Sequence, residues 1–218
     1  IVIPDMHVDG APLIHHPDSR LLPPHNLDIE RDIHTVRFER ARRYVAANDV
    51  NRITVPTPDA WIGIASTGVT YHEVRESLRR LGLTNDHEIS AAGIRLVEYR
   101  MPLPFDPDLM RRFAAGLDEL VVVEEKNPTL ELFVKNALYG TSTQPLVVGK
   151  YDDCGPLIPN YGAIVSDVLT PALRRRLELR IGDRLAERVQ VHHHCVERLD
   201  VVLGQRPCVV RQVAPGKQ

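Results

Sequence analysis

The sequence predicts an α/β fold: a three-layer domain around a parallel sheet, with an N-terminal arm and helix and a C-terminal helical extension. Three observations support this prediction. Short apolar runs fit for buried strands alternate with amphipathic segments in the order β-α-β-α-β-α-β, which is typical of parallel sheets with right-handed crossovers. The amphipathic segments have the length of crossover helices. Charged or turn-forming residues follow the apolar runs, at the edge where open parallel sheets carry their binding crevices.

The clearest strand–helix unit spans residues 116–139. Its apolar run, residues 119–123, is short enough for a buried strand, and three charged residues follow it. Asn127 is a good N-cap and Pro128 a good first helical residue, so we expect a helix to begin there. The residues behind them recur at spacings of three and four and give one apolar face: Leu130, Phe133, Val134, Ala137 and Leu138.

Two similar units come before this one, and one strand follows it. We expect strands at residues 61–66, 94–99 and 145–148, with helices after the first two. In the first helix, Thr70 and Glu73 have the spacing of a capping box, and Gly82 suits the position after the helix end. The second helix opens at Asp106-Pro107.

The two ends of the chain differ from this central part. Residues 1–28 hold five prolines and predict an extended arm, residues 29–48 predict a helix, and residues 54–59 read as a linker. Residues 1–55 then form the arm and helix, residues 56–165 the α/β domain, and residues 166–218 a C-terminal extension. Apolar residues from Leu169 to Val189 recur every fourth position, with a break at Gly182. We expect this stripe and the arm to pack against the domain or against other copies.

Composition and charge exclude several classes. The 218 residues carry a net charge of −2, which predicts neither a nucleic-acid nor a membrane partner. No apolar run approaches the ~18 residues of a membrane span. Three widely spaced cysteines indicate reduced thiols and a cytoplasmic protein. The chain begins with Ile rather than Met, which is consistent with a fragment.

Three turns at the carboxyl ends of the strands are the candidate site: Ser66-Thr67-Gly68, Arg100-Met101 and Glu124-Glu125-Lys126. A small-molecule or interdomain crevice at this edge follows from the topology. Alternatively, Glu125 or Lys126 pairs across a domain interface. The glycines around the first turn do not have the spacing of a dinucleotide-binding loop. We expect no catalytic residue.

Two other groups of residues have a plain structural interpretation. The histidines of the arm and of the run 192–195 lack the spacing of metal ligands, so we expect no bound metal. Arg174, Arg175 and Arg176 could form a basic patch, but interleaved acidic residues favour a solvated helix face.

Three stretches together resemble the 2-oxoacid:ferredoxin oxidoreductases, in particular the indolepyruvate branch with fused subunits. They are GIASTGVTYHEVRESLRRLGL, GIRLVEYRMPLPFDPDLMRRFAAGLDELVVVEEKNPTLE and PLVVGKYDDCG. The matching part of the family is its intermediate domain, which is similar to the C-terminal domain of transketolase. The sequence departs from the family at Val69 and near Glu98, where Lys is common, and at Asn127, where Arg is common.

The resemblance implies a thiamine-diphosphate enzyme that converts a 2-oxoacid, such as an arylpyruvate, to an acyl-coenzyme A and passes electrons to ferredoxin. Mg²⁺, an iron–sulfur cluster and coenzyme A are implied for that enzyme. The motifs that hold these groups are missing from the chain, so we expect a structural and assembly domain, inactive alone and associated with the other domains or subunits and with further copies. The alternative is a free-standing doubly wound module that binds a nucleotide or coenzyme A.

Overall fold

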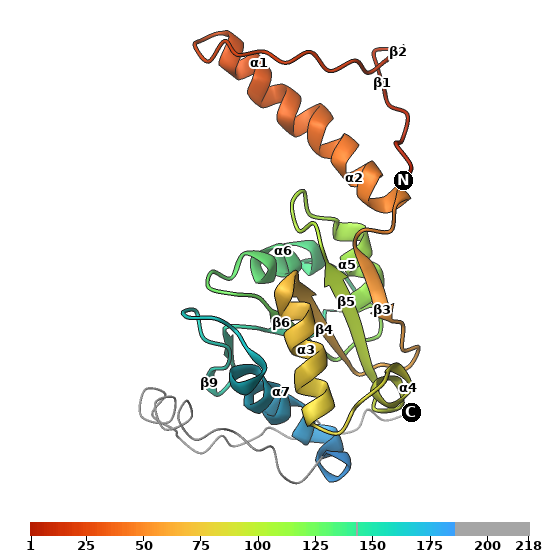
Figure 1. The fold of residues 1–218 in the computed structure, drawn as a ribbon, viewed down its shortest axis with the longest axis vertical. Coiled ribbons are helices and arrows are strands. Elements are labelled where there is room, and N and C mark those ends of the chain that lie inside the picture. The colour runs from red at the N-terminus through yellow and green to blue at the C-terminus, as the bar shows by residue number, and fades with distance from the viewer. Residues whose placement is uncertain (143, 186–218) are drawn as a thin grey trace.

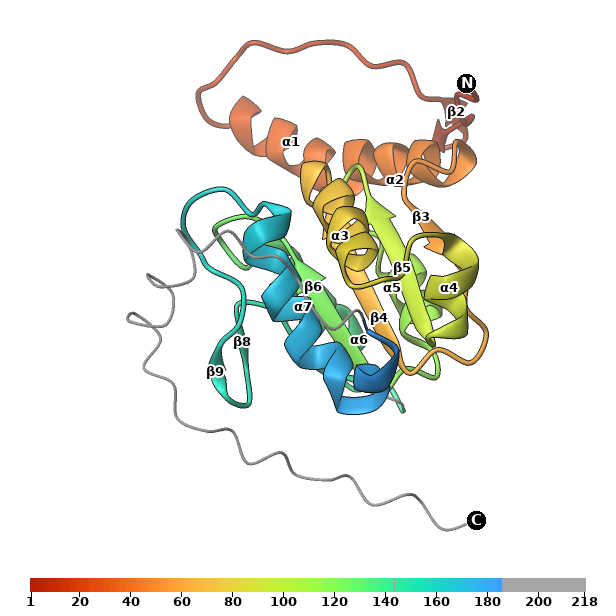
Figure 2. The ribbon, with the colours of Figure 1, turned by 60° about the horizontal axis from the view of Figure 1, so that its bottom comes forward.

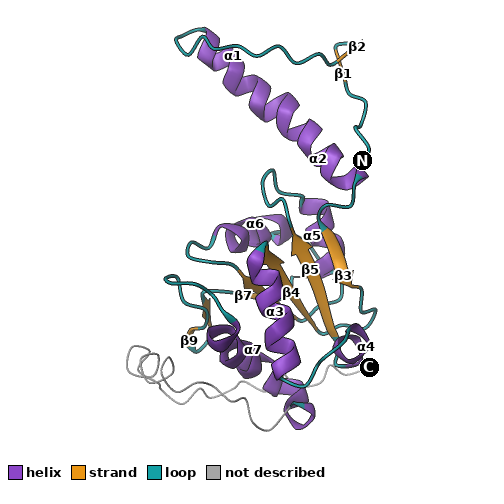
Figure 3. Cartoon of the chain, in the orientation of Figure 1, coloured by secondary structure: helices purple, strands orange, loops and turns teal. Residues whose placement is uncertain are grey.

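A mostly parallel five-stranded sheet forms the centre of the computed structural model, which describes residues 1–142 and 144–185 (Figures 1 and 3). The spatial order of the strands is β3-β5-β4-β6-β7. Only the pair β3–β5 is antiparallel; the other three pairs are parallel. The strands are β3 (Arg52–Val55), β4 (Ile62–Thr67), β5 (Ile94–Tyr99), β6 (Glu119–Val123) and β7 (Leu146–Val148).

The middle of this sheet is buried on both faces. Every residue of β5 and β6 is buried, as are the first five residues of β4. Ile64 of β4 pairs with Leu96 of β5 on one side and Val121 of β6 on the other. Strands that are buried along their length are characteristic of parallel sheets that have helices on both faces.

Helices cover the two faces unequally. One face packs against α3 (Val69–Arg80), α4 (Asp86–Ala91) and α7 (Ser166–Ile181), and the other against α5 (Pro107–Ala114) and α6 (Thr129–Leu138). Figure 2 shows α3 and α7 side by side on the first face. The predicted three-layer α/β fold is therefore confirmed.

The helix α7 buries the apolar stripe that the sequence placed after residue 165. Leu169, Leu173 and Leu177 are buried in the same core as the central strands. The helix ends at Ile181, before Gly182, as expected, and a short 3-10 turn η2 (Gly182–Arg184) follows. The stripe therefore packs against the domain, while the division of the chain at residues 55 and 165 stays a prediction.

A long helix stands clear of the sheet at the N-terminus (Figure 1). It runs without interruption through α1 (His25–Asp32), the π-helical turn η1 (Ile33–Arg37) and α2 (Phe38–Ala47). It lies on the side where β4, β5 and β6 end (Figures 1 and 2). The arm before it contains a small hairpin, β1 (His7–Val8) with β2 (Ala11–Pro12).

Three expectations about these elements are corrected. The N-terminal helix begins at His25, four residues earlier than its apolar stripe indicated. The sheet has five strands instead of four, because residues 52–55 form β3 on its edge. The prolines at 56 and 58 made this region read as a linker, yet Val55 is buried against the core. The short helix α4 was not expected, because its six residues are too few to show the helical spacing of apolar residues.

The arginines of α7 also differ from expectation. Arg176 is buried and forms a double hydrogen bond with Glu119, through Nε at 2.7 Å and Nη2 at 2.8 Å. Its Nη1 lies 3.1 Å from Asp152 in the hairpin β8 (Tyr151–Asp152) with β9 (Gly155–Pro156). The interpretation of residues 174–176 as a solvated face is thus wrong for Arg176, whose counterions lie far from it in sequence.

Candidate functional site

A pocket of about 390 Å³ lies at the carboxyl edge of the sheet, between the ends of β4 and β6. The turn after β4 and the start of α3 form one wall, and the turn after β6 forms the other. Its lining residues are Thr67, Val69, Thr70, Glu124, Glu125, Lys126, Asn127 and Thr129. The pocket thus lies where the sequence placed a crevice.

Thr70 ties the two walls together. Its Oγ1 lies 2.7 Å from the carbonyl oxygen of Thr67 and 3.0 Å from that of Val123, and it accepts a hydrogen bond from the Thr67 N–H at 3.2 Å. Gly68 caps the helix with a φ of +51°, a conformation that favours glycine. The expected capping box is wrong, because Glu73 instead accepts from the Ser166 N–H at 2.6 Å.

Glu124 is buried and caps the next helix. Its Oε2 accepts from the Leu130 N–H at 2.7 Å and its Oε1 from the Glu131 N–H at 2.9 Å. The expected cap at Asn127 is wrong, since α6 begins at Thr129. Burial raises the pKa of Glu124, and the two backbone donors oppose that rise.

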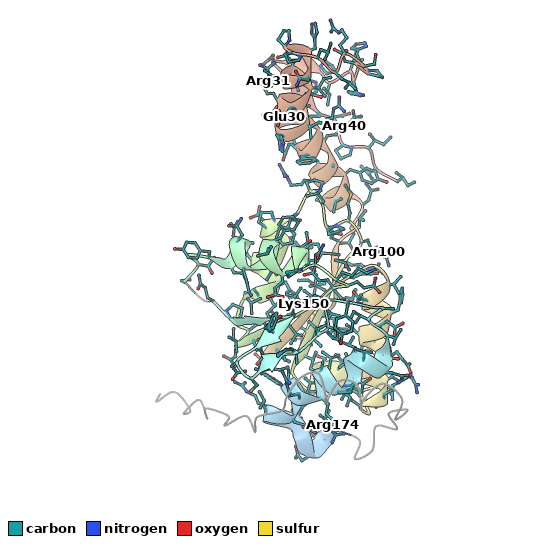
Figure 4. The ribbon with its side chains drawn as sticks, turned by 90° about the vertical axis from the view of Figure 1, so that its left-hand side faces the viewer. Glu30, Arg31, Arg40, Arg100, Lys150 and Arg174 are labelled. Carbon is teal, nitrogen blue, oxygen red and sulfur yellow. The ribbon has the colours of Figure 1, made fainter. Side chains whose placement is uncertain are left out.

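Lys150 contacts Glu124 and is also buried. Its Nζ donates to the carbonyl oxygen of Glu124 at 2.5 Å and to that of Pro159 at 3.0 Å. Its backbone N–H donates to Glu131 Oε2 at 3.0 Å. Burial lowers the pKa of Lys150, while the carboxylates of Glu124, Glu131 and Glu125 oppose this shift. Figure 4 shows Lys150 within the body of the domain.

The residues that follow Glu124 remain at the surface. Glu125 is exposed and accepts from the Ile164 N–H at 3.3 Å, which ties the turn to the loop before α7. Lys126 is exposed, has a φ of +53° and has no ion-pair partner within the described residues. For a residue with a Cβ, this backbone region costs about 1 kcal/mol.

The turn after β5 lies apart from the pocket. Met101 exchanges two hydrogen bonds with the side chain of Asn51, at 2.9 and 2.8 Å, which joins this turn to the start of β3. Arg100 Nε lies 3.0 Å from Oε2 of the buried Glu98, and this contact raises the pKa of Arg100. Ser66 is buried, and its Oγ has no hydrogen-bond partner among residues 1–142 and 144–185.

The structure therefore brings together part of the predicted site. Thr67, Glu124, Glu125 and Lys126 line one pocket, while Ser66, Gly68, Arg100 and Met101 lie outside its lining. A binding role for any of the eight stays a prediction. Sequence reasoning missed Thr70, which was assigned only to a cap, and Lys150. The Gly149-Lys150 pair follows the fourth expected strand, so the rule used for the other turns could have found Lys150.

One group of side chains has the composition of a metal site. Ligand atoms of Asp152, Asp153 and Cys154 lie within 4.8 Å of one another. Arg175 and Arg176 hold the Asp152 carboxylate. The residues 192–195 lie outside the described part of the chain. No helix within residues 1–142 and 144–185 has the length and apolar character to cross a membrane.

Comparison with known proteins places this chain in a family. The sequence profile of the indolepyruvate oxidoreductase domain matches residues 52–198, well over half of its length. This chain belongs to the indolepyruvate oxidoreductase domain family. The suspected resemblance is therefore confirmed.

The curated relatives are much longer proteins. The indolepyruvate oxidoreductase subunit IorA of Pyrococcus horikoshii is 31% identical over 98 residues, which are 45% of this chain and 14% of that protein. The subunit of the same name from Thermococcus kodakarensis is 29% identical over 129 residues, 59% of this chain and 18% of that protein. The chain thus spans less than a fifth of the length of these relatives.

Two solved structures also show a likeness. A 2-oxoglutarate:ferredoxin oxidoreductase from Magnetococcus marinus has a TM-score of 0.43 and 17% identity over 77% of this chain and 25% of its own. A split-gene transketolase, described as an inactive tetramer, has a TM-score of 0.39 and 19% identity over 59% of this chain and 43% of its own. Neither score reaches 0.5, so the family match alone carries the assignment.

Proposed function

We propose that this chain is a structural and assembly domain of a 2-oxoacid:ferredoxin oxidoreductase. The observation that carries the proposal is the family match over residues 52–198. The complete enzyme would oxidatively decarboxylate a 2-oxoacid, such as indolepyruvate or another arylpyruvate, to an acyl-coenzyme A and reduce ferredoxin. It would work in the cytoplasm, with further subunits and copies of this chain as partners.

The polar groups at the carboxyl edge support a structural role. Both carboxylate oxygens of Glu124 accept backbone hydrogen bonds, and Lys150 Nζ is bonded to two carbonyl oxygens. Glu125 accepts from Ile164 in the loop that leads to α7, and Glu73 accepts from Ser166, the first residue of α7. These side chains are therefore engaged in joining the turns of the sheet to α6 and α7.

The pocket residues do not fit thiamine diphosphate. Two carboxylates, Glu124 and Glu125, and one cation, Lys126, line the pocket. A diphosphate would meet more negative than positive charge there, and the carboxylate of Glu124 is already bonded to α6. We therefore assign thiamine diphosphate, its Mg²⁺, the iron–sulfur cluster and coenzyme A to other parts of the complete enzyme.

A free-standing module for a nucleotide or coenzyme A is the second candidate, because the pocket has the size of a small-molecule site. Calorimetric titration separates the two. The structural domain binds neither thiamine diphosphate with Mg²⁺, nor ADP, nor coenzyme A. Saturable binding of ADP or coenzyme A that is lost in Lys126→Ala would favour the module, and tight binding of thiamine diphosphate would contradict an inactive fragment.

A chimera tests the proposed enzyme directly. Residues 52–198 replace the matching segment in the Thermococcus kodakarensis IorA relative, and the product is assayed for 2-oxoacid-dependent reduction of ferredoxin. We expect the chimera to assemble and to keep its activity. A chimera that assembles and binds thiamine diphosphate but is inactive would contradict a purely structural role. Failure to assemble would contradict the family role of this chain.

A further inference from the structure

The N-terminal helix of residues 25–47 is poorly buried for its length. It spans roughly 35 Å at 1.5 Å per residue, yet Val45 is its only buried residue. The apolar side chains of Ile29, Ile33 and Phe38 are partly exposed. Helices in proteins owe most of their stability to packing of an apolar face, so this helix is suited to a partner that covers it.

The π-helical turn keeps the apolar residues on one face. The Phe38 N–H bonds to the Ile33 carbonyl, so these two side chains follow each other at a spacing of five. With the usual spacings on either side, the apolar face runs from Ile29 through Ile33 and Phe38 to Ala41 and Val45. We call these five residues the N-helix stripe.

Within the stripe only Val45 is buried, and Ile29, Ile33, Phe38 and Ala41 remain partly exposed. A cleft of about 760 Å³ separates α2 from α5 and α6. The residues of α2 on this cleft are Glu39, Arg42, Arg43 and Ala46. At 100° per residue they lie on a different side of the helix from the stripe.

Charge is unevenly distributed along the same helix. Residues 25–35 contain three carboxylates and one arginine, whereas residues 36–47 contain four arginines and one carboxylate. Asp32 pairs with Arg37 at 2.6 Å and Arg42 with Glu39 at 3.3 Å, in ion pairs that are more than a third exposed. Such pairs are weak and exchange readily. Glu30 and Arg40, labelled in Figure 4, have no ion-pair partner among the described residues.

We propose that a second copy of this chain docks on the N-helix stripe, with the two helices antiparallel. A two-fold axis level with Val36 brings Glu30 of one copy level with Arg42 of the other, because each lies six residues from Val36. Asp32 likewise comes level with Arg40 of the second copy, since each lies four residues from Val36.

The two residues of each pair also lie on the same side of the stripe. Counted at 100° per residue, with the wider π turn included, Glu30 and Arg42 flank the stripe on one side, and Asp32 and Arg40 flank it on the other. An isologous antiparallel pair brings like flanks together. The acidic half of each helix therefore lies along the basic half of the other, around the apolar contact of the stripes. This contact specifies the association between copies that the proposed function includes, and it does not depend on the reaction.

Sedimentation velocity of charge-reversed variants tests the pairing. One variant carries Glu30→Lys and Asp32→Lys, and the other carries Arg40→Glu and Arg42→Glu. Each variant alone places like charges opposite one another, so we expect the association constant of its dimer to fall by about tenfold or more. Mixing the two in equal amounts restores all four opposite-charge pairs, so the mixture should dimerise as the unaltered chain does.

A matched control exchanges an exposed pair elsewhere, with Arg75→Glu and Asp86→Lys, and should leave dimerisation unchanged. Helical circular dichroism confirms that each variant is folded. A monomeric unaltered chain would overturn the proposal. So would a dimer that resists both reversals, or two weakened variants that fail to associate when mixed. A monomer would leave the proposed reaction untouched, because the chimera measures that separately.

Discussion

Glu124 shows how a residue at the expected site can be used for folding. Replacing it with Ala leaves the N–H groups of Leu130 and Glu131 without acceptors in a buried position. We expect a loss of about 1–3 kcal/mol in the free energy of unfolding, measured by urea denaturation. Glu125→Ala is the matched control and should change that free energy by less than about 0.5 kcal/mol. Equal effects would show that Glu124 is not the cap of α6.

The buried Lys150 should make the free energy of unfolding depend on pH in the alkaline range. Because burial lowers its pKa in the folded state, the unfolded chain binds more protons between that lowered pKa and the ordinary value. The free energy of unfolding gains a contribution that increases as pH rises through this interval. Lys150→Met should remove this contribution, as measured by urea denaturation at several pH values.

Lys126→Met is the control for this pH dependence, because Lys126 is exposed. Its profile should parallel that of the unaltered chain. If Lys150→Met also kept the unaltered profile, the Lys150 ammonium would have to be stable in its buried position, and the direction of its pKa shift would be wrong.

The two residues also mark what the sequence could reveal. The rule that crevices lie at the carboxyl ends of parallel strands led directly to Glu124 and applies equally to Lys150. The rule could not predict whether each side chain stabilises the fold or faces a ligand. Whether a carboxylate caps a helix or faces a ligand depends on where α6 begins, and its first residue is Thr129 instead of the expected Pro128.

At the scale of elements, the buried pair of Arg176 and Glu119 joins α7 to the start of β6. Arg176→Met leaves the buried Glu119 without a counterion, so it should cost about 3–5 kcal/mol. Glu119→Leu should cost less, because Arg176 keeps its contacts with Asp152 and Asp153. The double variant should be more stable than Arg176→Met alone, because the lone carboxylate of Glu119 is then gone. Thermal unfolding measures this double-mutant cycle. Additive losses would mean that the two residues act independently.

Sequence patterns predicted the central strands better than the strand at the edge of the sheet. The strands of residues 94–99 and 119–123 were found with their observed bounds, because short segments that are mostly apolar and lie between turns have few other interpretations. The edge strand β3 was missed because only its last residue is buried, so it has no apolar run to detect. The partners of Arg176 were not predictable, since 57 residues separate it from Glu119.

For the whole molecule, the open question is where the folding unit ends. The sequence suggested a boundary at residue 165, before the stripe of α7. In the structure, Leu169, Leu173, Leu177 and Ile181 of α7 are buried in the core of the sheet. Burying one such side chain contributes roughly 1.5–3 kcal/mol, and a domain has only about 5–15 kcal/mol in all. We therefore propose that the cooperative unit extends at least to the end of α7.

Two truncated chains test this proposal. A chain that ends at residue 185 keeps the buried face of α7 and should unfold in one cooperative transition. A chain that ends at residue 165 exposes the core under α7 and leaves Glu119 without Arg176, so it should lack a cooperative transition. Calorimetry or urea denaturation followed by circular dichroism distinguishes the two. A cooperative transition of equal midpoint in the shorter chain would return the boundary to residue 165 and make α7 an appendage.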